Sequence, residues 1–117
     1  MDFEKENKQG VVIYHIKQER LDTAVAPELK ADFLLTLENG EKNFLMDLTA
    51  VKYVDSSGLG ALLLGLRQAK QSDGDFKLYG AAQRVKKLIE IAHLNDHLLC
   101  LDDEAAGLSA FGESAVN

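Results

Sequence analysis

Residues 53–70 read YVDSSGLGALLLGLRQAK. Four leucines in this stretch recur at the i, i+3, i+4 and i+7 spacing of one helix face: Leu59, Leu62, Leu63 and Leu66. The pattern predicts a helix of about four turns that begins near residues 56–58. A serine at that point is a good N-cap, because its oxygen accepts a hydrogen bond from a free N–H of the first turn.

Capping explains one of the serines Ser56 and Ser57, but it explains neither the second serine nor the glycines that follow. Gly58, Gly60 and Gly65 are poor helix formers, and each costs about 1 kcal/mol relative to alanine. Such small residues let another backbone approach closely. They indicate either tight packing against the protein's own sheet or a docking surface in the first turn, and spacing alone favours neither.

A phosphate on one of these serines has a predictable effect. It adds about −1.5 to −2 charges, and a helix N-terminus tolerates that charge because free N–H groups and the positive end of the dipole face it. A partner packed on the same surface meets a new charge and loses shape complementarity. A phosphate here would therefore act as a binary switch that need not unfold the protein.

Outward from this stretch, apolar strands alternate with helical patterns. Strands are expected at 11–17, 43–49, 75–80 and 98–101, with a short one near 19–22 after a tight reversal; helices are expected at 23–40, 82–94 and 103–111. Asp22 or Thr23 is expected to cap the first helix and Gly40 to end it. We predict an α/β (α+β) fold, with a mixed sheet and helices packed on it, in a single domain 1–117 with a frayed tail at 112–117.

The composition excludes several classes of function. The net charge of −6 argues against nucleic acid and anionic membrane as direct partners, which both reward clustered Lys and Arg. No apolar run approaches the length of a membrane span or resembles a signal peptide, so we expect a cytoplasmic protein without direct membrane insertion. The single Cys100 excludes a disulfide within the chain and is expected to be a buried, inert thiol.

The segment FLMDLTAVKYVDSSGLGALLLGLRQAK, residues 44–70, resembles the signature of the STAS domain (sulphate transporter and anti-sigma factor antagonist). The match is specific in the Asp-Ser-Ser-Gly-Leu-Gly block and looser elsewhere, where residues 20–33 and 84–111 are similar to the family's first helix and its closing elements. The resemblance implies a four- to five-stranded mixed sheet with about four helices packed mainly on one face.

The resemblance also implies a function without catalysis or cofactor. Stand-alone members are anti-sigma factor antagonists: the unphosphorylated form binds an anti-sigma factor that is commonly a serine kinase, and a sigma factor is freed. Phosphorylation of the second serine, here Ser57, ends binding, and a serine phosphatase restores it. Ser56 is the second choice for the phosphate. The resemblance places partner binding around the helix start, at Asp22, Asp55, Ser56, Ser57, Gly58, Leu59 and Gly60, with Asp47 also near the switch.

Two positions depart from the family pattern. Glu19 stands where a glycine often precedes Arg-Leu-Asp, so the first reversal can differ in shape. His93 stands where glycine often follows the third helix, so it must adopt a left-handed conformation or end the helix differently.

Other chemistries fit the sequence less well. A hydrolase elbow needs Gly-x-Ser-x-Gly, but Asp55 and Leu59 flank Ser57 at those positions, and no motif places a histidine beside it. His93 and His97 have the i, i+4 spacing of a zinc helix but lack the glutamate and a third ligand, so no metal site is predicted. The glycines lack a dinucleotide or P-loop pattern, and weak nucleotide binding, which is associated with some family members, remains a remote alternative.

The main alternative is a constitutive scaffold subunit of a lipid-transport or stress-signalling complex, where the serine regulates assembly or only packs. The intact Asp-Ser-Ser-Gly-Leu-Gly block favours the sigma-regulatory interpretation.

Overall fold

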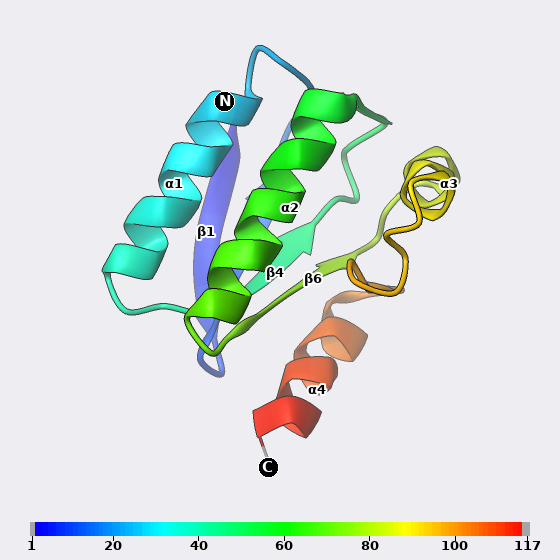
Figure 1. Cartoon of the computed structure of the whole chain (residues 1–117). Coiled ribbons are helices and arrows are strands. Elements are labelled where there is room, and N and C mark those ends of the chain that lie inside the picture. Colours follow the sequence, from blue (N-terminus) through cyan, green and yellow to red (C-terminus); the bar gives the residue numbers. More distant parts are fainter. Residues whose placement is uncertain (1, 116–117) are drawn as a thin grey trace.

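A mixed β-sheet organises the chain (Figure 1). The computed structural model describes residues 2–115, with side chains described as far as residue 111. The sheet contains β1 (Phe3–Lys8), β2 (Val11–Ile16), β4 (Asn43–Asp47), β6 (Asp75–Tyr79) and β7 (Cys100–Leu101). Their order is β1-β2-β4-β6-β7, and only the β1–β2 pair is antiparallel. The predicted mixed sheet is confirmed.

Two short strands form a separate parallel pair, β3 (Arg20–Leu21) with β5 (Tyr53–Val54). The short strand expected near 19–22 therefore exists, and it does not pair with β2. It pairs instead with the residues that lead into the serine stretch, and the Asp55 N–H donates to the Leu21 carbonyl at 3.1 Å. This pairing brings the end of β3 beside the start of the following helix.

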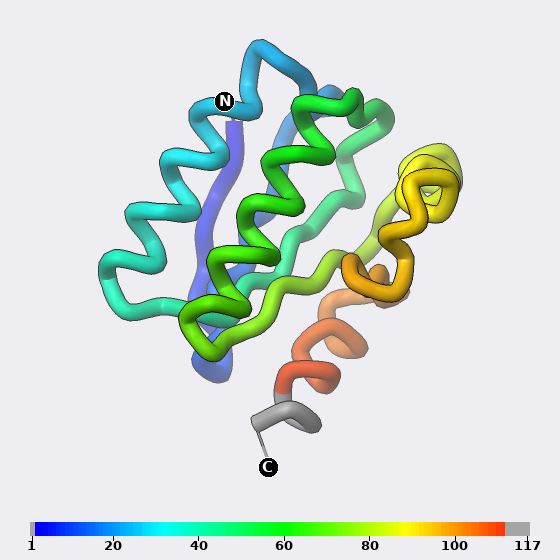
Figure 2. The backbone as a smooth tube through the Cα atoms, in the orientation of Figure 1, coloured from blue at the N-terminus to red at the C-terminus, as the bar shows by residue number. Residues whose placement is uncertain are grey.

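Four helices cover the sheet: α1 (Ala26–Glu38), α2 (Ser56–Gln71), α3 (Gln83–Ile91) and α4 (Glu104–Ala115). Helices α1 and α2 lie side by side on one face, and α4 packs on the other (Figures 1 and 2). Helix α3 contributes its buried side chains to the same core as α1 and α2. The prediction of helices mainly on one face is confirmed, with α4 as the exception.

The main core lies between the sheet and α1–α2 and is built on aromatic rings. Tyr14, Phe33, Phe44 and Phe76 are fully buried, and Phe33 meets the rings of Phe44 and Phe76 edge-on at centroid distances of 5.8 and 5.4 Å. A second core on the opposite face buries Leu45 of β4 against α4. Strand β4 is thus buried on both faces, as its continuous apolar run indicates.

Helix α1 starts without the predicted cap. Its N-cap position is Val25, with no side-chain hydrogen bond, because a turn closed by the Asp22 carbonyl intervenes. At the other end, Gly40 adopts a φ of +95° and its N–H donates to the Leu37 carbonyl at 2.9 Å, which confirms the predicted glycine stop.

Helix α3 ends at Ile91, three residues before its predicted limit. His93 has a φ of +60°, and hydrogen bonds run from His93 N–H to the Glu90 carbonyl and from Leu94 N–H to the Ile89 carbonyl. These bonds form a Schellman motif with a histidine at the position that usually holds glycine. The left-handed conformation expected of His93 is confirmed.

The structure differs from the sequence-based expectation at an edge strand, at Cys100 and in the C-terminal tail. The edge strand β1 was not predicted, since its polar sequence FEKENK gives no apolar signal. Cys100 is half-buried rather than buried. The tail 112–117, expected to be frayed, has a helical backbone as far as Ala115, and residues 116–117 lie outside the described part of the chain.

Among residues 2–115, no helix combines the length and apolar character needed to cross a bilayer.

Candidate functional site at the start of helix α2

Asp55, and not a serine, caps helix α2. Its backbone is extended (φ −97°, ψ −174°), and its Oδ1 accepts a hydrogen bond from the Gly58 N–H at 2.9 Å. Ser56 and Ser57 occupy the first two helical positions instead. The prediction of a serine cap is wrong because the extended backbone ends at Asp55 and Ser56 is already helical, so the cap position falls one residue before the serine pair.

The second carboxylate oxygen of Asp55 ties the helix start to the loop after β3. Asp55 Oδ2 accepts from the backbone N–H of Thr23 at 3.3 Å and from its hydroxyl at 3.4 Å. The pKa of Asp55 is held below its ordinary value, mainly by the hydrogen bond from the Gly58 N–H. Desolvation acts to raise this pKa, and the hydrogen bonds from Thr23 help to lower it. A single ionised side chain therefore fixes two segments of the site.

The Ser57 hydroxyl lies 3.1 Å from the Thr23 hydroxyl, and either group can donate this hydrogen bond. Ser57 is half-buried and Ser56 is exposed. Thr23 was not among the predicted partner-binding residues, although its place directly after Asp22 in the chain could have indicated it. Because Asp55 performs the capping, helix α2 does not depend on the Ser57 hydroxyl.

The three aspartates expected near the switch are not all there. Asp22 is half-buried beside Thr23, where it accepts from the Ala24 N–H at 3.1 Å and lies 3.5 Å from Arg20 Nε. Asp22 and Asp55 thus place two carboxylates in the segments that meet at Ser57. Asp47 instead bonds His15 and Thr49 in the second polar cluster described below.

The glycines of α2 have different surroundings. A Cβ on Gly58 would lie 2.2 Å from the Leu21 carbonyl oxygen, and one on Gly65 would lie 2.4 Å from the Phe76 ring. Close internal packing therefore explains these two glycines. A Cβ on Gly60 would meet nothing within 4 Å, and the half-buried Leu59 beside it packs against the core. Of the three glycines in α2, Gly60 is the one at which no contact within the protein excludes a larger side chain.

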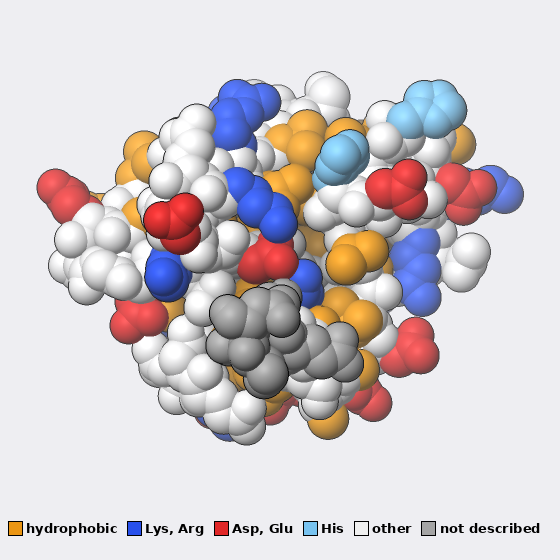
Figure 3. All heavy atoms as spheres, turned by 60° about the horizontal axis from the view of Figure 1, so that its bottom comes forward, with side chains coloured by type: hydrophobic (Ala, Val, Ile, Leu, Met, Phe, Trp, Pro, Cys, Tyr) orange, Lys and Arg blue, Asp and Glu red, His pale blue; other side chains and the backbone are white. Residues whose placement is uncertain are grey.

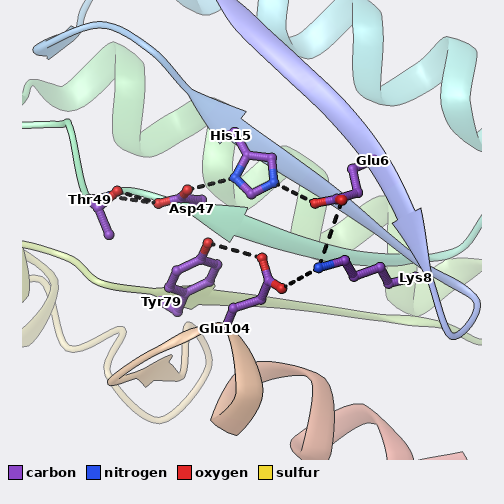
Figure 4. Close-up of polar contacts among 7 residues, drawn as sticks. All are labelled: Glu6, Lys8, His15, Asp47, Thr49, Tyr79 and Glu104. Atoms are coloured by element: carbon purple, nitrogen blue, oxygen red, sulfur yellow. Dashed lines mark hydrogen bonds and ion pairs between the residues drawn. The ribbon is translucent and has the colours of Figure 1, made fainter.

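A second polar cluster lies on the α4 side of the sheet (Figure 4). His15 is held between two carboxylates: its Nδ1 lies 2.7 Å from Asp47 Oδ2 and its Nε2 lies 2.9 Å from Glu6 Oε1. Partial burial acts to lower the pKa of His15, but the hydrogen bonds with Asp47 and Glu6 outweigh it and raise the pKa. The pKa of Asp47 is lowered. Burial acts to raise it, but the hydrogen bonds from His15 and Thr49 outweigh burial.

This cluster does not form a hydrolase triad with the serines. Both ring nitrogens of His15 are bonded to carboxylates, and the side-chain hydrogen bond of Ser57 goes to Thr23. His93 and His97 do not share a helix, because α3 ends at Ile91.

The same cluster brings together three groups that can ligate a metal, although the sequence predicted no metal site. Ligand atoms of Glu6, His15 and Glu104 lie within 4.8 Å of one another. Lys8 Nζ lies 2.8 Å from a Glu104 oxygen and 3.8 Å from a Glu6 oxygen, so a cation of the protein already pairs with these carboxylates.

Comparisons with known proteins agree with the fold. The anti-sigma-B factor antagonist of Staphylococcus aureus is 32% identical over 76 residues, which cover 65% of this chain and 70% of that protein. A putative anti-sigma factor antagonist from Thermotoga maritima superimposes with a TM-score of 0.87 at 22% identity, covering 94% of both chains. The Bacillus cell fate determinant SpoIIAA in its phosphorylated form gives 0.71 at 17% identity, covering 99% of this chain and 100% of that one.

The resemblance noted in the sequence is confirmed at the level of the family. The family model described as the STAS domain matches residues 2–106, a range that includes every strand of the structure and the serine pair. The chain therefore belongs to the STAS domain family.

Proposed function

We propose that this chain is an anti-sigma factor antagonist whose unphosphorylated form binds an anti-sigma factor with serine kinase activity and so frees a sigma factor. The curated relatives, which are anti-sigma-B factor antagonists, support the general function. The geometry at the start of α2 supports the choice of Ser57 as the residue that switches binding off.

The proposal rests mainly on the different structural roles of Asp55 and Ser57. Asp55 supplies the cap and the tie to Thr23, while the Ser57 hydroxyl makes one hydrogen bond, to another hydroxyl at the surface. A phosphate on Ser57 replaces that bond and leaves the cap in place. Modification can therefore change the surface without removing what holds the helix.

Electrostatics give the phosphate its effect on a partner. About −1.5 to −2 charges would be added beside the carboxylate of Asp55 and near Asp22, whose chain neighbour Thr23 hydrogen-bonds the Ser57 hydroxyl. The N-terminal dipole of α2 offsets part of the repulsion, by roughly 0.3–1 kcal/mol at an exposed helix end. A partner packed on this surface has no such compensation and would have to desolvate the added charge.

The docking surface comprises the start of α2 and the loop after β3, with Asp22, Ser56, Ser57, Leu59 and Gly60 at its exposed or half-buried positions. Gly60 has open space above its Cα, which allows the backbone of a partner to come close. In this proposal, residues 1–117 act as one STAS-like domain. A serine phosphatase removes the phosphate from Ser57 and restores binding. The protein carries out this function in the cytoplasm.

The experiment is phosphate mapping after incubation of the purified chain with ATP and a kinase-type anti-sigma factor from the same organism. We expect a mass increase of one phosphate, localised by fragmentation to Ser57 and absent in Ser57→Ala. Ser56→Ala is the matched control and should be modified normally. Modification of Ser57→Ala would transfer the switch to Ser56. No modification, together with capture of a transporter ATPase from the native host, would replace the proposal with the scaffold alternative.

A further inference from the structure

A groove of about 500 Å³ lies between β5 and α3. We call it the α3 groove, and it is lined by Tyr53, Val54, Arg84, Val85, Lys87, Leu88 and Ile91. Figure 1 shows α3 set apart from α1 and α2, beyond the edge of the layer that these two helices form. The groove is close along the chain to the serine pair but includes neither serine.

The α3 groove exposes apolar side chains that the core leaves uncovered or only partly buries, the half-buried Leu88 among them. Helix α3 buries Val85 and Ile89 in the main core. Ile91, on the other side of the helix, is 68% exposed, and the ring of Tyr53 across the groove is 36% exposed. Leu88 joins them one helical turn before Ile91. An apolar strip of this kind beside polar residues is typical of a binding surface.

The charged side chains that line the α3 groove are both positive. They belong to Arg84 and Lys87, and no carboxylate among the described side chains forms an ion pair with either. Arg20, which pairs with Asp22 at 3.5 Å, also stacks on the Tyr53 ring, with its guanidinium carbon 4.5 Å from the centroid. On the side seen in Figure 3, acidic and basic side chains are interspersed. Two unpaired cations at one apolar groove stand out in a chain of net charge −6.

We propose that the α3 groove binds an acidic amphipathic segment of a protein partner. Its apolar side chains would contact Leu88 and Ile91, and flanking Asp or Glu side chains would pair with Arg84 and Lys87. An amphipathic helix seated in an apolar groove is a common mode of peptide recognition, and complementary charge adds specificity and speed of association. An anionic bilayer is disfavoured because the net charge of −6 opposes approach to it. The proposal does not depend on Ser57.

The test uses the full chain and three fluorescein-labelled designed peptides of about 18 residues, long enough for roughly five helical turns. The first peptide carries leucines at i, i+3, i+4 and i+7 with glutamates beside them. The second replaces every glutamate with lysine, and the third replaces every leucine with serine. Fluorescence anisotropy should show saturable binding of the first peptide and at least roughly tenfold weaker binding of the other two.

Variants then locate the binding. Ile91→Glu and the double change Arg84→Glu with Lys87→Glu should each weaken the first peptide at least roughly tenfold. Lys86→Glu is the matched control, because Lys86 belongs to the same helix but lines a different hollow with Ile89 and Leu98. It should change the affinity less than roughly twofold, and circular dichroism should show all variants folded.

Several results would overturn the proposal: no saturable binding of the first peptide, equal binding of all three peptides, or equal losses in Ile91→Glu and Lys86→Glu. Cosedimentation with phosphatidylserine vesicles that Ile91→Glu abolishes would identify a membrane surface as the occupant instead. Self-association in the ultracentrifuge that the same variant abolishes would identify a second copy of the chain.

Discussion

The glycines of α2 allow a test of which small residues serve the fold and which serve a partner. Gly60→Ala adds a methyl group in open space. It should therefore stabilise the protein by up to about 1 kcal/mol, the difference in helix propensity between alanine and glycine. Gly65→Ala gains the same propensity, but its Cβ would lie 2.4 Å from the Phe76 ring and 3.0 Å from the Phe33 ring. Overpacking of this kind costs about 1–3 kcal/mol, so the net effect should be neutral to about 2 kcal/mol destabilising.

The assay is urea unfolding followed by circular dichroism, with the midpoint and slope fitted separately so that a change in stability is distinguished from a change in the unfolded state. Gly60→Ala should raise the midpoint and Gly65→Ala should not. If binding to the anti-sigma factor falls in Gly60→Ala while its stability rises, the glycine serves the partner. Equal stabilisation by both substitutions would refute the packing argument drawn from the Phe76 contact.

Three further predictions concern helix ends and the second polar cluster. Asp55→Ala should lower the urea midpoint clearly more than Ser57→Ala, because only Asp55 caps α2; equal losses would return the capping role to the serine. His93→Gly should stabilise the protein by about 0.5–1 kcal/mol, since glycine adopts the left-handed conformation without steric cost; thermal unfolding would measure this, and a lower midpoint would contradict it. The raised pKa of His15 means that its protonated form stabilises the fold: this contribution should be complete below about pH 6.5, the ordinary value, and lost as the pH rises through the folded-state value. Unfolding curves across this range should show the loss in the native chain but not in His15→Gln.

The sequence predicted what depends on apolar periodicity. The leucines of α2 and the apolar run 44–46 of β4 located these elements correctly, because burial of their side chains dominates their energetics. Strand β1 was missed because it is an edge strand of mostly charged residues, held by backbone pairing with β2. Hydrogen bonds between backbones leave no pattern in the side chains.

The structure brings Asp55 and Ser57 together with the loop after β3, but the sequence did not predict which side chain caps the helix. Asp55, Ser56 and Ser57 can all cap a helix, and only the extended backbone at Asp55 decides among them. The role of Thr23 depends on the β3–β5 pairing, which joins segments about thirty residues apart. The α3 groove could not be predicted, because the sequence gives the apolar residues of α3 but not which of them the core leaves exposed.

The central claim is that a phosphate on Ser57 ends partner binding without unfolding the domain. The most direct test is isothermal titration of the anti-sigma factor with the unmodified chain and with the chain phosphorylated on Ser57. We predict an affinity at least roughly tenfold lower for the phosphorylated chain, which corresponds to about 1.4 kcal/mol, at unchanged thermal stability. Equal affinities for the two forms would contradict the account.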